Sequence, residues 1–204
     1  MGVKNNKPVA VVLGGTNPHK ELIKNLKNRG YYTILIDYYE KPPAKRIADI
    51  HVRESTLDKE KVLEVAKSFK AKLVIATCID QANAVACYVG EKLNLPIPYP
   101  FQIANLVGNK VTMKKSMMDF DIPTSKYITV KQNNSYDLKG LEFPLVVKPS
   151  DTNGSKGVKI VENFPELLIA TKEAFEVSRN KELIIEEFIS GDEIGIDCFI
   201  DNNE

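Results

Sequence analysis

The sequence has little of what marks several common classes of protein. Among its 204 residues there is no tryptophan, and there are only three cysteines and two histidines. The odd number and wide spacing of Cys78, Cys87 and Cys198 exclude a secreted disulfide framework and a paired CxxC site, so we interpret them as small buried residues in a reducing compartment. With so few soft ligands, zinc is not expected, and any metal would be bound by oxygen.

Neither sign of charge dominates. The chain has 28 Lys and Arg against 27 Asp and Glu, a formal net charge of +1. This balance argues against nucleic acid or a membrane surface as a partner held by a general electrostatic field. No apolar run approaches the roughly 20 residues that cross a bilayer, and the segment before Pro8 lacks the apolar core of a secretion signal. We therefore expect a cytoplasmic protein.

The first hundred residues alternate short apolar runs with amphipathic stretches. Runs rich in β-branched residues at 9–13, 33–37 and 73–77 predict buried strands. The stretches between them have apolar residues three and four apart, which predicts helices, and the first helix is expected to have Asn17 as its N-cap and Pro18 as its first residue. This alternation predicts an α/β fold with a doubly wound parallel sheet.

The pattern changes after a segment with three prolines, residues 95–100, which marks the expected domain boundary. Beyond it, a helical stretch is predicted over about 105–120. Short strands are predicted at 125–130, 145–149, 158–161, 183–185 and 194–200. Asn163 and Glu166 form a capping-box-like start of a helix with Phe164, Leu167, Leu168 and Phe175 on its apolar face. This part of the chain is expected to be α+β with antiparallel strands.

The sharpest chemical feature is a polar loop that follows the strand ending in Lys148. A buried lysine is costly unless an anion meets it, and a loop with Gly154, Ser155 and Gly157 can turn amide groups and a hydroxyl toward phosphates. Lys156 adds a second positive charge. The loop is neither a Walker A sequence nor a GxGxxG motif. The alternative is a solvated hairpin whose lysines extend into water.

Weaker signals lie in the first hundred residues. The turn at 14–17 could bind an anion, although the same turn is needed to build the fold. Asp37 could imitate the ribose-binding acid of a dinucleotide site, but without GxGxxG a structural role is the better interpretation. Asp80 and Gln81 follow the third strand and are candidates for binding an acceptor, whereas the neighbouring Cys78 is interpreted as packing.

Four segments in order resemble the ATP-grasp superfamily: 108–110, Lys148, the glycine loop and 184–193. The chain is most similar to its carboxylate–amine ligases and carbamoyl-phosphate-synthase-like members. The resemblance implies a Rossmann-like pre-ATP-grasp parallel sheet over 1–100 and an α+β nucleotide-binding lid subdomain over 101–189. Residues 190–204 would be the start of a C-terminal subdomain. Because 201–204 look like a hairpin tip without its returning strand, we expect a fragment.

The resemblance also implies roles in binding ATP. Lys110 and Lys148 match the lysines that contact nucleotide phosphates. The lid loop that folds over those phosphates matches Ser155, Lys156, Gly157 and Val158.

The adenosine would be held by the hinge. The Glu187 carbonyl and the Ile189 amide match the groups that hold adenine. Glu186 belongs to the same hinge, and Phe188 or Ile185 would pack near the base. Glu193 matches the carboxylate that binds ribose. From the residues alone, Glu186 and Glu187 would be a solvated pair of acids.

The chemistry implied by the resemblance is ligation. ATP with Mg²⁺ would phosphorylate a small carboxylate to an acyl phosphate, which an amine would then displace. The metal ligands are expected beyond residue 204, so no metal ligand and no catalytic residue is assigned, and this chain alone is not expected to turn over. A homo-oligomer is a candidate state.

Three alternatives remain open at this point. One is a non-catalytic nucleotide-binding module, and another is a nicotinamide-dependent oxidoreductase, against which the missing GxGxxG counts. The third is a ligase that activates bicarbonate, as in biotin-carboxylase-like enzymes.

Overall fold

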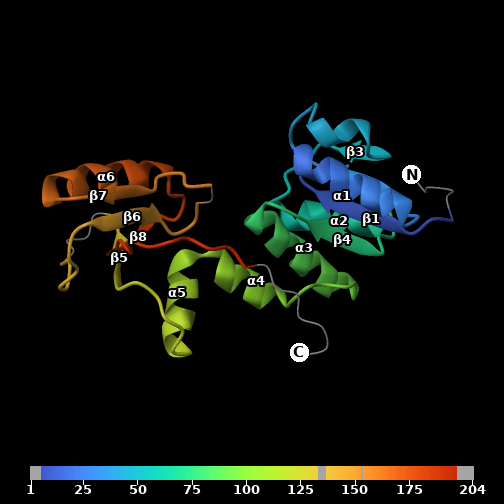
Figure 1. Cartoon of the computed structure of the whole chain (residues 1–204). Helices are drawn as coiled ribbons and strands as arrows, with labels where there is room; N and C mark the ends of the chain where they lie inside the picture. Colours follow the sequence, from blue (N-terminus) through green and yellow to red (C-terminus); the bar gives the residue numbers. More distant parts are fainter. Residues whose placement is uncertain (1–5, 133–136, 153, 197–204) are drawn as a thin grey trace. The chain divides into compact units, whose positions relative to one another are not determined.

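The computed structural model describes residues 6–132, 137–152 and 154–196. The chain forms two compact units that divide between Met113 and Lys114 (Figure 1). Each unit has its own sheet of four strands.

The first unit is a parallel sheet with the strand order β3-β2-β1-β4. This arrangement confirms the predicted doubly wound α/β fold. The strands are β1 (Val9–Leu13), β2 (Tyr32–Ile36), β3 (Ile50–Val52) and β4 (Leu73–Ala76). The helices are α1 (Asn17–Asn28), a 3-10 helix (Pro43–Arg46), α2 (Lys59–Ser68), α3 (Asp80–Leu93) and α4 (Phe101–Gly108).

Alternate residues of β1 supply the two layers of this unit. Val11 and Leu13 lie in a core that includes the buried faces of α2 and α3. Ala10 and Val12 lie in a second core with Ile23 of α1. Because successive side chains of a strand point to opposite faces, an uninterrupted apolar strand of this kind must be covered on both sides.

The start of α1 differs from the prediction. Thr16 is the N-cap and Asn17 is the first helical residue, with Pro18 in the first turn. The Thr16 hydroxyl lies 2.7 Å from Nδ1 of His19, one turn into the helix. Gly14 has φ +105°, and a Cβ there would lie 2.6 Å from Nε2 of His19. The glycine at position 14 is therefore explained by its close packing against a buried histidine.

His19 predicts a loss of stability in mild acid. Its side chain is fully buried, and this burial lowers its pKa below the usual 6.5, although backbone groups and Asp37 partly oppose the effect. As the pH falls below about 6.5, the unfolded chain therefore takes up a proton that the folded chain resists, which lowers the free energy of unfolding by at most about 1.4 kcal/mol per pH unit. Urea unfolding between pH 7.5 and 5.5 should show a flatter dependence for His19→Gln than for the parent, and equal slopes would contradict this.

The second unit contains an antiparallel sheet with the order β5-β8-β6-β7. Its strands are β5 (Tyr127–Lys131), β6 (Leu145–Pro149), β7 (Lys159–Val161) and β8 (Glu182–Glu187). The helix α5 (Lys110–Asp119) leads into this unit, and α6 (Phe164–Val177) follows β7. The predicted antiparallel α+β character is confirmed. A strand was also predicted at 194–200, but residues 194–196 are not strand, and the rest of that segment lies outside the described residues.

Two predicted helices need correction. The stretch over 105–120 is two helices, α4 and α5, because Asn109 begins a new one by accepting hydrogen bonds from the amides of Val111 and Thr112. The Asn163 cap of α6 is confirmed, since its side chain accepts from the Glu166 amide at 3.0 Å. The buried face of α6, however, consists of Leu167, Ala170, Thr171 and Ala174. Phe164 and Leu168 are half-exposed.

The prolines at 95–100 do not separate the compact units. Instead, α4 packs on α3, where Ala84, Cys87 and Ala104 share a small buried cluster. The helix therefore belongs to the first unit, and the division falls later than the predicted boundary at residue 100.

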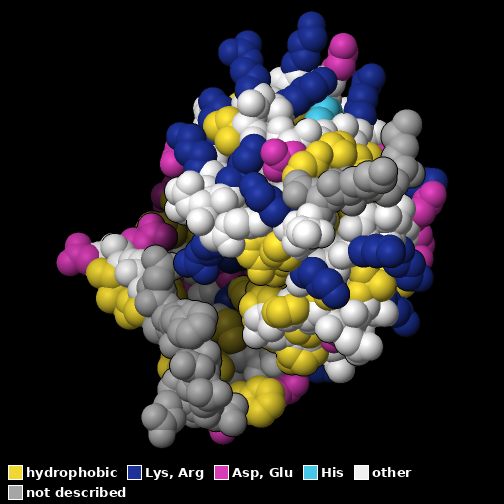
Figure 2. All heavy atoms as spheres, turned by 90° about the vertical axis from the view of Figure 1, so that its right-hand side faces the viewer, with side chains coloured by type: hydrophobic (Ala, Val, Ile, Leu, Met, Phe, Trp, Pro, Cys, Tyr) yellow, Lys and Arg dark blue, Asp and Glu magenta, His cyan; other side chains and the backbone are white. Residues whose placement is uncertain are grey.

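The surface drawn in Figure 2 carries basic side chains with acidic and apolar ones between them. Within the described part of the chain, no helix combines the length and the apolar character needed to span a membrane.

Candidate functional site

The face of the second sheet that turns away from α6 carries the polar cluster of this unit. Leu183 and Ile185 of β8 join the core with α6. Glu186 is the next residue of β8, so its side chain points to the opposite face. There its register partners are Tyr127 on β5 and Val146 on β6, and Lys148 follows two residues after Val146. Strand alternation and register thus place Lys148 diagonally beside Glu186.

Glu186 holds two lysines. Its Oε1 accepts a hydrogen bond from Lys148, and its Oε2 lies 2.9 Å from Nζ of Lys114 on α5. The Ser125 hydroxyl donates to the same Oε2 at 3.0 Å. The Glu186 side chain is 10% exposed, against 6% for Lys114 and 21% for Lys148. The interpretation of Glu186 as a solvated acid is therefore wrong, because the pairing happens through tertiary structure.

The two lysines of this cluster change the pKa of Glu186. Burial opposes ionisation of Glu186, but hydrogen bonds and attraction from Lys148 and Lys114 outweigh it, so that the pKa of the carboxyl lies below its usual 4.5. By formal charge, two ammonium groups and one carboxylate give the cluster a net charge of +1. An anion can approach the accessible part of Lys148. When no anion is bound, the lysine is still paired with Glu186.

The predicted hinge follows directly after Glu186. The Glu187 amide donates to the carbonyl of Lys126 and the Phe188 amide donates to the carbonyl of Pro144, each at 3.0 Å. The Glu187 carboxylate lies 3.5 Å from Nζ of Lys126. Among the described residues, no acceptor lies within hydrogen-bond distance of the Ile189 amide, whose residue is 70% exposed. The hinge is thus fixed by the sheet up to Phe188 and offers its next amide to solvent.

The glycine loop joins β6 to β7 as a hairpin, and its base is anchored by polar contacts. The Asp151 carboxylate accepts from the amides of Arg179 and Asn180 at 3.0 and 2.9 Å. The Thr152 hydroxyl donates to the carbonyl of Lys156 at 2.9 Å. Ser155, Lys156 and Val158 themselves are exposed. The loop therefore has a fixed base and an exposed tip.

Gly157 has a structural reason to be glycine, which yields a prediction. Its φ is +73°, and a Cβ there would lie 2.6 Å from Cγ2 of Val177 and 2.9 Å from Cγ of Pro149. Gly157→Ala is expected to lower the free energy of unfolding by about 1–3 kcal/mol, through strain and overpacking. Gly154→Ala is a matched control, because φ is +63° but no atom lies within 4 Å. Urea unfolding of both variants measures the effect, and equal losses would refute the packing argument.

Lys110 and Lys114 have different places on α5. Lys110, the predicted phosphate ligand, is the first residue of α5 and belongs to the first unit. Lys114 lies one turn later and is the residue that meets Glu186. Sequence reasoning missed Lys114, although its spacing of four from Lys110 places both on one side of the helix. Glu193 is exposed.

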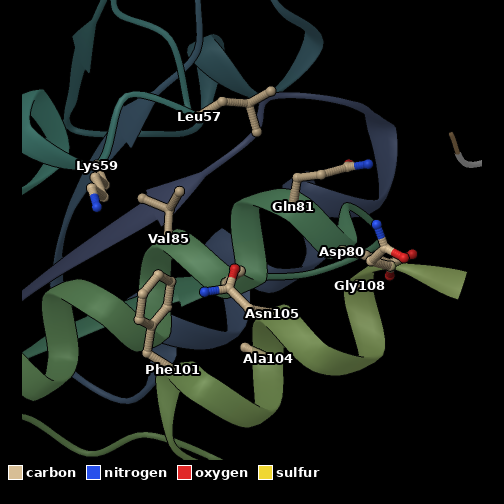
Figure 3. Close-up of a pocket in the computed structure, with 11 residues that line it drawn as sticks. Leu57, Lys59, Asp80, Gln81, Val85, Phe101, Ala104, Asn105 and Gly108 are labelled. Carbon is tan, nitrogen blue, oxygen red and sulfur yellow. The ribbon is translucent and has the colours of Figure 1, made fainter. Parts of the chain in front are cut away.

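A separate pocket of about 310 Å³ lies in the first unit, where α3 and α4 meet the loop before α2. Figure 3 shows Asp80 by Gly108 at one end and Lys59 toward Phe101 at the other. The wall between them is apolar, with Val85 and Ala104. Nζ of Lys59 lies 4.7 Å from the ring centroid of Tyr88, a cation–π distance. The predicted acceptor residues Asp80 and Gln81 thus line a pocket at the carboxyl edge of the parallel sheet.

The remaining candidates in the first unit are structural or exposed. Asp37 accepts from the amides of Gly15 and Tyr39 at 2.7 and 2.8 Å, so it fastens the turn after β1, as the structural interpretation requires. Cys87 is buried as expected, but Cys78 is exposed at φ +60°, so its interpretation as packing is wrong. Cys198 lies outside the described residues. Within the described ranges, no group of three or more His, Cys, Asp or Glu side chains is placed to hold a metal ion.

Comparison with known proteins finds relatives of this chain. Residues 108–204 match the ATP-grasp (A) domain of phosphoribosylglycinamide synthetase. Over 192 residues the chain is 31% identical to a formate-dependent phosphoribosylglycinamide formyltransferase of Prochlorococcus marinus, covering 92% of this chain and 49% of that protein. The chain thus spans about half the length of the curated relatives it matches.

Solved structures share the fold. An ADP complex of N5-carboxyaminoimidazole ribonucleotide synthetase superposes with a TM-score of 0.72 at 20% identity, over 90% of this chain and 47% of the other. The biotin carboxylase domain of a Hydrogenobacter thermophilus carboxylase, in complex with MgADP and bicarbonate, gives 0.70 at 19% identity, over 91% and 45%. The family match and the shared fold agree: residues 108–204 match an ATP-grasp domain, and the chain has the fold of the solved structures named above.

Proposed function

We propose that the second unit binds ATP and that the whole protein uses it to activate a carboxylate. The observation that carries the proposal is Lys148, which is held by Glu186 while 21% of its side chain stays exposed. A lysine fixed in this way supplies donors and positive charge to a polyphosphate without first having to be desolvated or ordered. The ADP complexes among structures of the same fold support this assignment.

The other contacts follow from the family and from the geometry. Lys110 would be the second phosphate ligand, and the lid would consist of Ser155, Lys156, Gly157 and Val158. The exposed Ile189 amide and the Glu187 carbonyl would hold adenine, with Phe188 beside the base and Glu193 on the ribose. Mg²⁺ would accompany the nucleotide.

The reaction we propose transfers the terminal phosphoryl group of ATP to a carboxylate oxygen, which gives ADP and an acyl phosphate. An amine then attacks the acyl carbon and displaces phosphate. The chain's contribution is to position the polyphosphate and neutralise its charge, and the lid excludes water that would hydrolyse the intermediate. The pocket at Asp80 and Gln81 would receive the acceptor.

The named relatives favour an enzyme over a non-catalytic module, since they are a formyltransferase, a synthetase and a carboxylase. The bicarbonate in the last of these keeps bicarbonate activation as the second candidate within the same chemistry. A cytoplasmic location and a homo-oligomeric state stay predictions.

Trapping of the intermediate tests the proposal. The whole protein is incubated with Mg-ATP, hydroxylamine and pools of carboxylates, and hydroxamate and ADP are measured together. We expect one pool to yield both in equal amounts, because hydroxylamine captures an acyl phosphate. ADP release that depends on bicarbonate, without hydroxamate, would favour the second candidate. ATP binding without turnover in any pool would overturn the ligase proposal in favour of a binding module.

A further inference from the structure

Lys114 has no N–H group left for a ligand. Its ammonium lies 2.9 Å from Oγ of Ser125, 3.3 Å from the carbonyl of the same residue and 2.9 Å from Oε2 of Glu186, and it also donates to the hydroxyl of Thr124. The Tyr127 ring centroid lies 4.9 Å away. An ammonium has three donors, and here four acceptors share them. The side chain is also almost fully buried.

Lys148 is the opposite case. In the described part of the structure, its ammonium has one acceptor, Oε1 of Glu186. Two of its three N–H groups therefore remain for solvent or a ligand. The two lysines share one carboxylate but differ in what they can offer to a nucleotide.

The net charge of the cluster depends on Lys114. With both lysines and Glu186 charged, the cluster carries +1. Without Lys114 it would carry zero, because the carboxylate would cancel Lys148 and would itself repel an approaching phosphate.

We propose that Lys114 is a positioning residue: it neutralises and orients Glu186, so that Lys148 keeps its positive charge for the nucleotide, and it does not touch the nucleotide itself. The proposal rests on the proposed function of this unit in binding ATP. The new element is an effect of Lys114 on nucleotide affinity without a contact to the nucleotide, because its ammonium is already shared among four protein acceptors.

The groups that face Glu186 define how this device responds to pH. They are Lys114 from α5, Lys148 from β6, and Tyr127 and the Ser125 hydroxyl from β5 and the segment before it. Each of the two lysines lowers the pKa of Glu186. In a variant without Lys114, this pKa is therefore higher, and Glu186 takes up a proton at a higher pH than in the parent.

The test is the affinity for ADP of the parent chain and of Lys114→Met, measured by calorimetry from pH 8 to pH 5. We expect the variant to bind about tenfold more weakly at pH 8, and the ratio of the two affinities to shrink toward 1 as the pH falls and Glu186 is neutralised. A direct contact with phosphate would give a ratio that is constant with pH. That result, or equal affinities throughout, would overturn the proposal.

A second variant keeps the test decisive if the first does not fold. Lys114→Met combined with Glu186→Gln removes both charges and leaves Lys148 with its own. It is expected to lose less than tenfold in ADP affinity at pH 8, because Lys148 keeps its positive charge although the carboxylate that orders it is gone. A loss of more than tenfold would mean that Lys114 is needed at the ligand and would overturn the proposal. Failure of the parent itself to bind ADP would refute the proposed function instead.

Discussion

Replacing Lys148 with alanine is expected to weaken the binding of ATP by roughly 10- to 150-fold, the range for a charge-assisted hydrogen bond worth about 1.5–3 kcal/mol. Of the three charged side chains of the cluster, that of Lys148 is the most exposed, at 21%. Without it, Glu186 stays paired with the buried Lys114, so the fold survives while the site loses its positive charge. Titration calorimetry with Mg-ATP on the whole protein measures the loss.

The matched control is Lys159→Ala. Lys159 lies on the same sheet and also pairs with a glutamate, Glu173, but both side chains are about half exposed. Exposed ion pairs contribute little, so neither ATP affinity nor stability should change appreciably. If Lys148→Ala bound ATP as tightly as this control, the assignment of the site would be wrong.

Glu186→Gln is expected to have the largest effect on folding, a loss of about 3–5 kcal/mol from the free energy of unfolding. The amide keeps the shape of the side chain, but it leaves the ammonium of Lys114 buried without a counter-charge. Urea unfolding at pH 7 measures the loss. Adding Lys114→Met to the same variant should recover much of it, because the unpaired charge is then gone.

The pH dependence of the free energy of unfolding also tests the pairing of Glu186 with its lysines. The pKa of Glu186 in the folded chain lies below its unfolded value of about 4.5, because the two lysines outweigh the effect of burial. Its stabilisation is therefore complete above that value and is lost as the pH falls through the folded pKa. In Glu186→Gln this acid limb should flatten, whereas Glu173→Gln, on the exposed pair, should keep it. A loss below 1 kcal/mol at pH 7 would show that Lys114 finds other compensation.

Much of the fold was predictable because its local signals agree with its tertiary structure. The β-branched runs at 9–13 and 73–77 are strands that both faces of a parallel sheet must bury. Signals that depend on one side chain were less secure. Half of the predicted apolar face of α6 was wrong: Leu167 and Phe175 pack in the core, whereas Phe164 and Leu168 lie on the solvent side.

The candidate site was predictable in part for a similar reason. Lys148 and Glu186 were identified by their places at strand ends in a family pattern, and the structure brings them together. Lys114 was not identified, because its role depends on a contact between α5 and β8. The two residues in contact, Lys114 and Glu186, are 72 positions apart in the sequence. The hydrogen bonds of Asp151 at the base of the loop were missed as well, since only tertiary structure brings it to the amides of Arg179 and Asn180.

The short strand β7 also affects how separate molecules meet. In the described part of the chain it pairs only with β6 and forms one edge of the antiparallel sheet. Lys159 stands on this edge between the exposed Val158 and Ile160. A charged residue on a short edge strand discourages pairing with the edge of another molecule, the first step of aggregation. The control substitution Lys159→Ala therefore removes a gatekeeper, and light scattering from that variant should rise at lower protein concentration than from the parent.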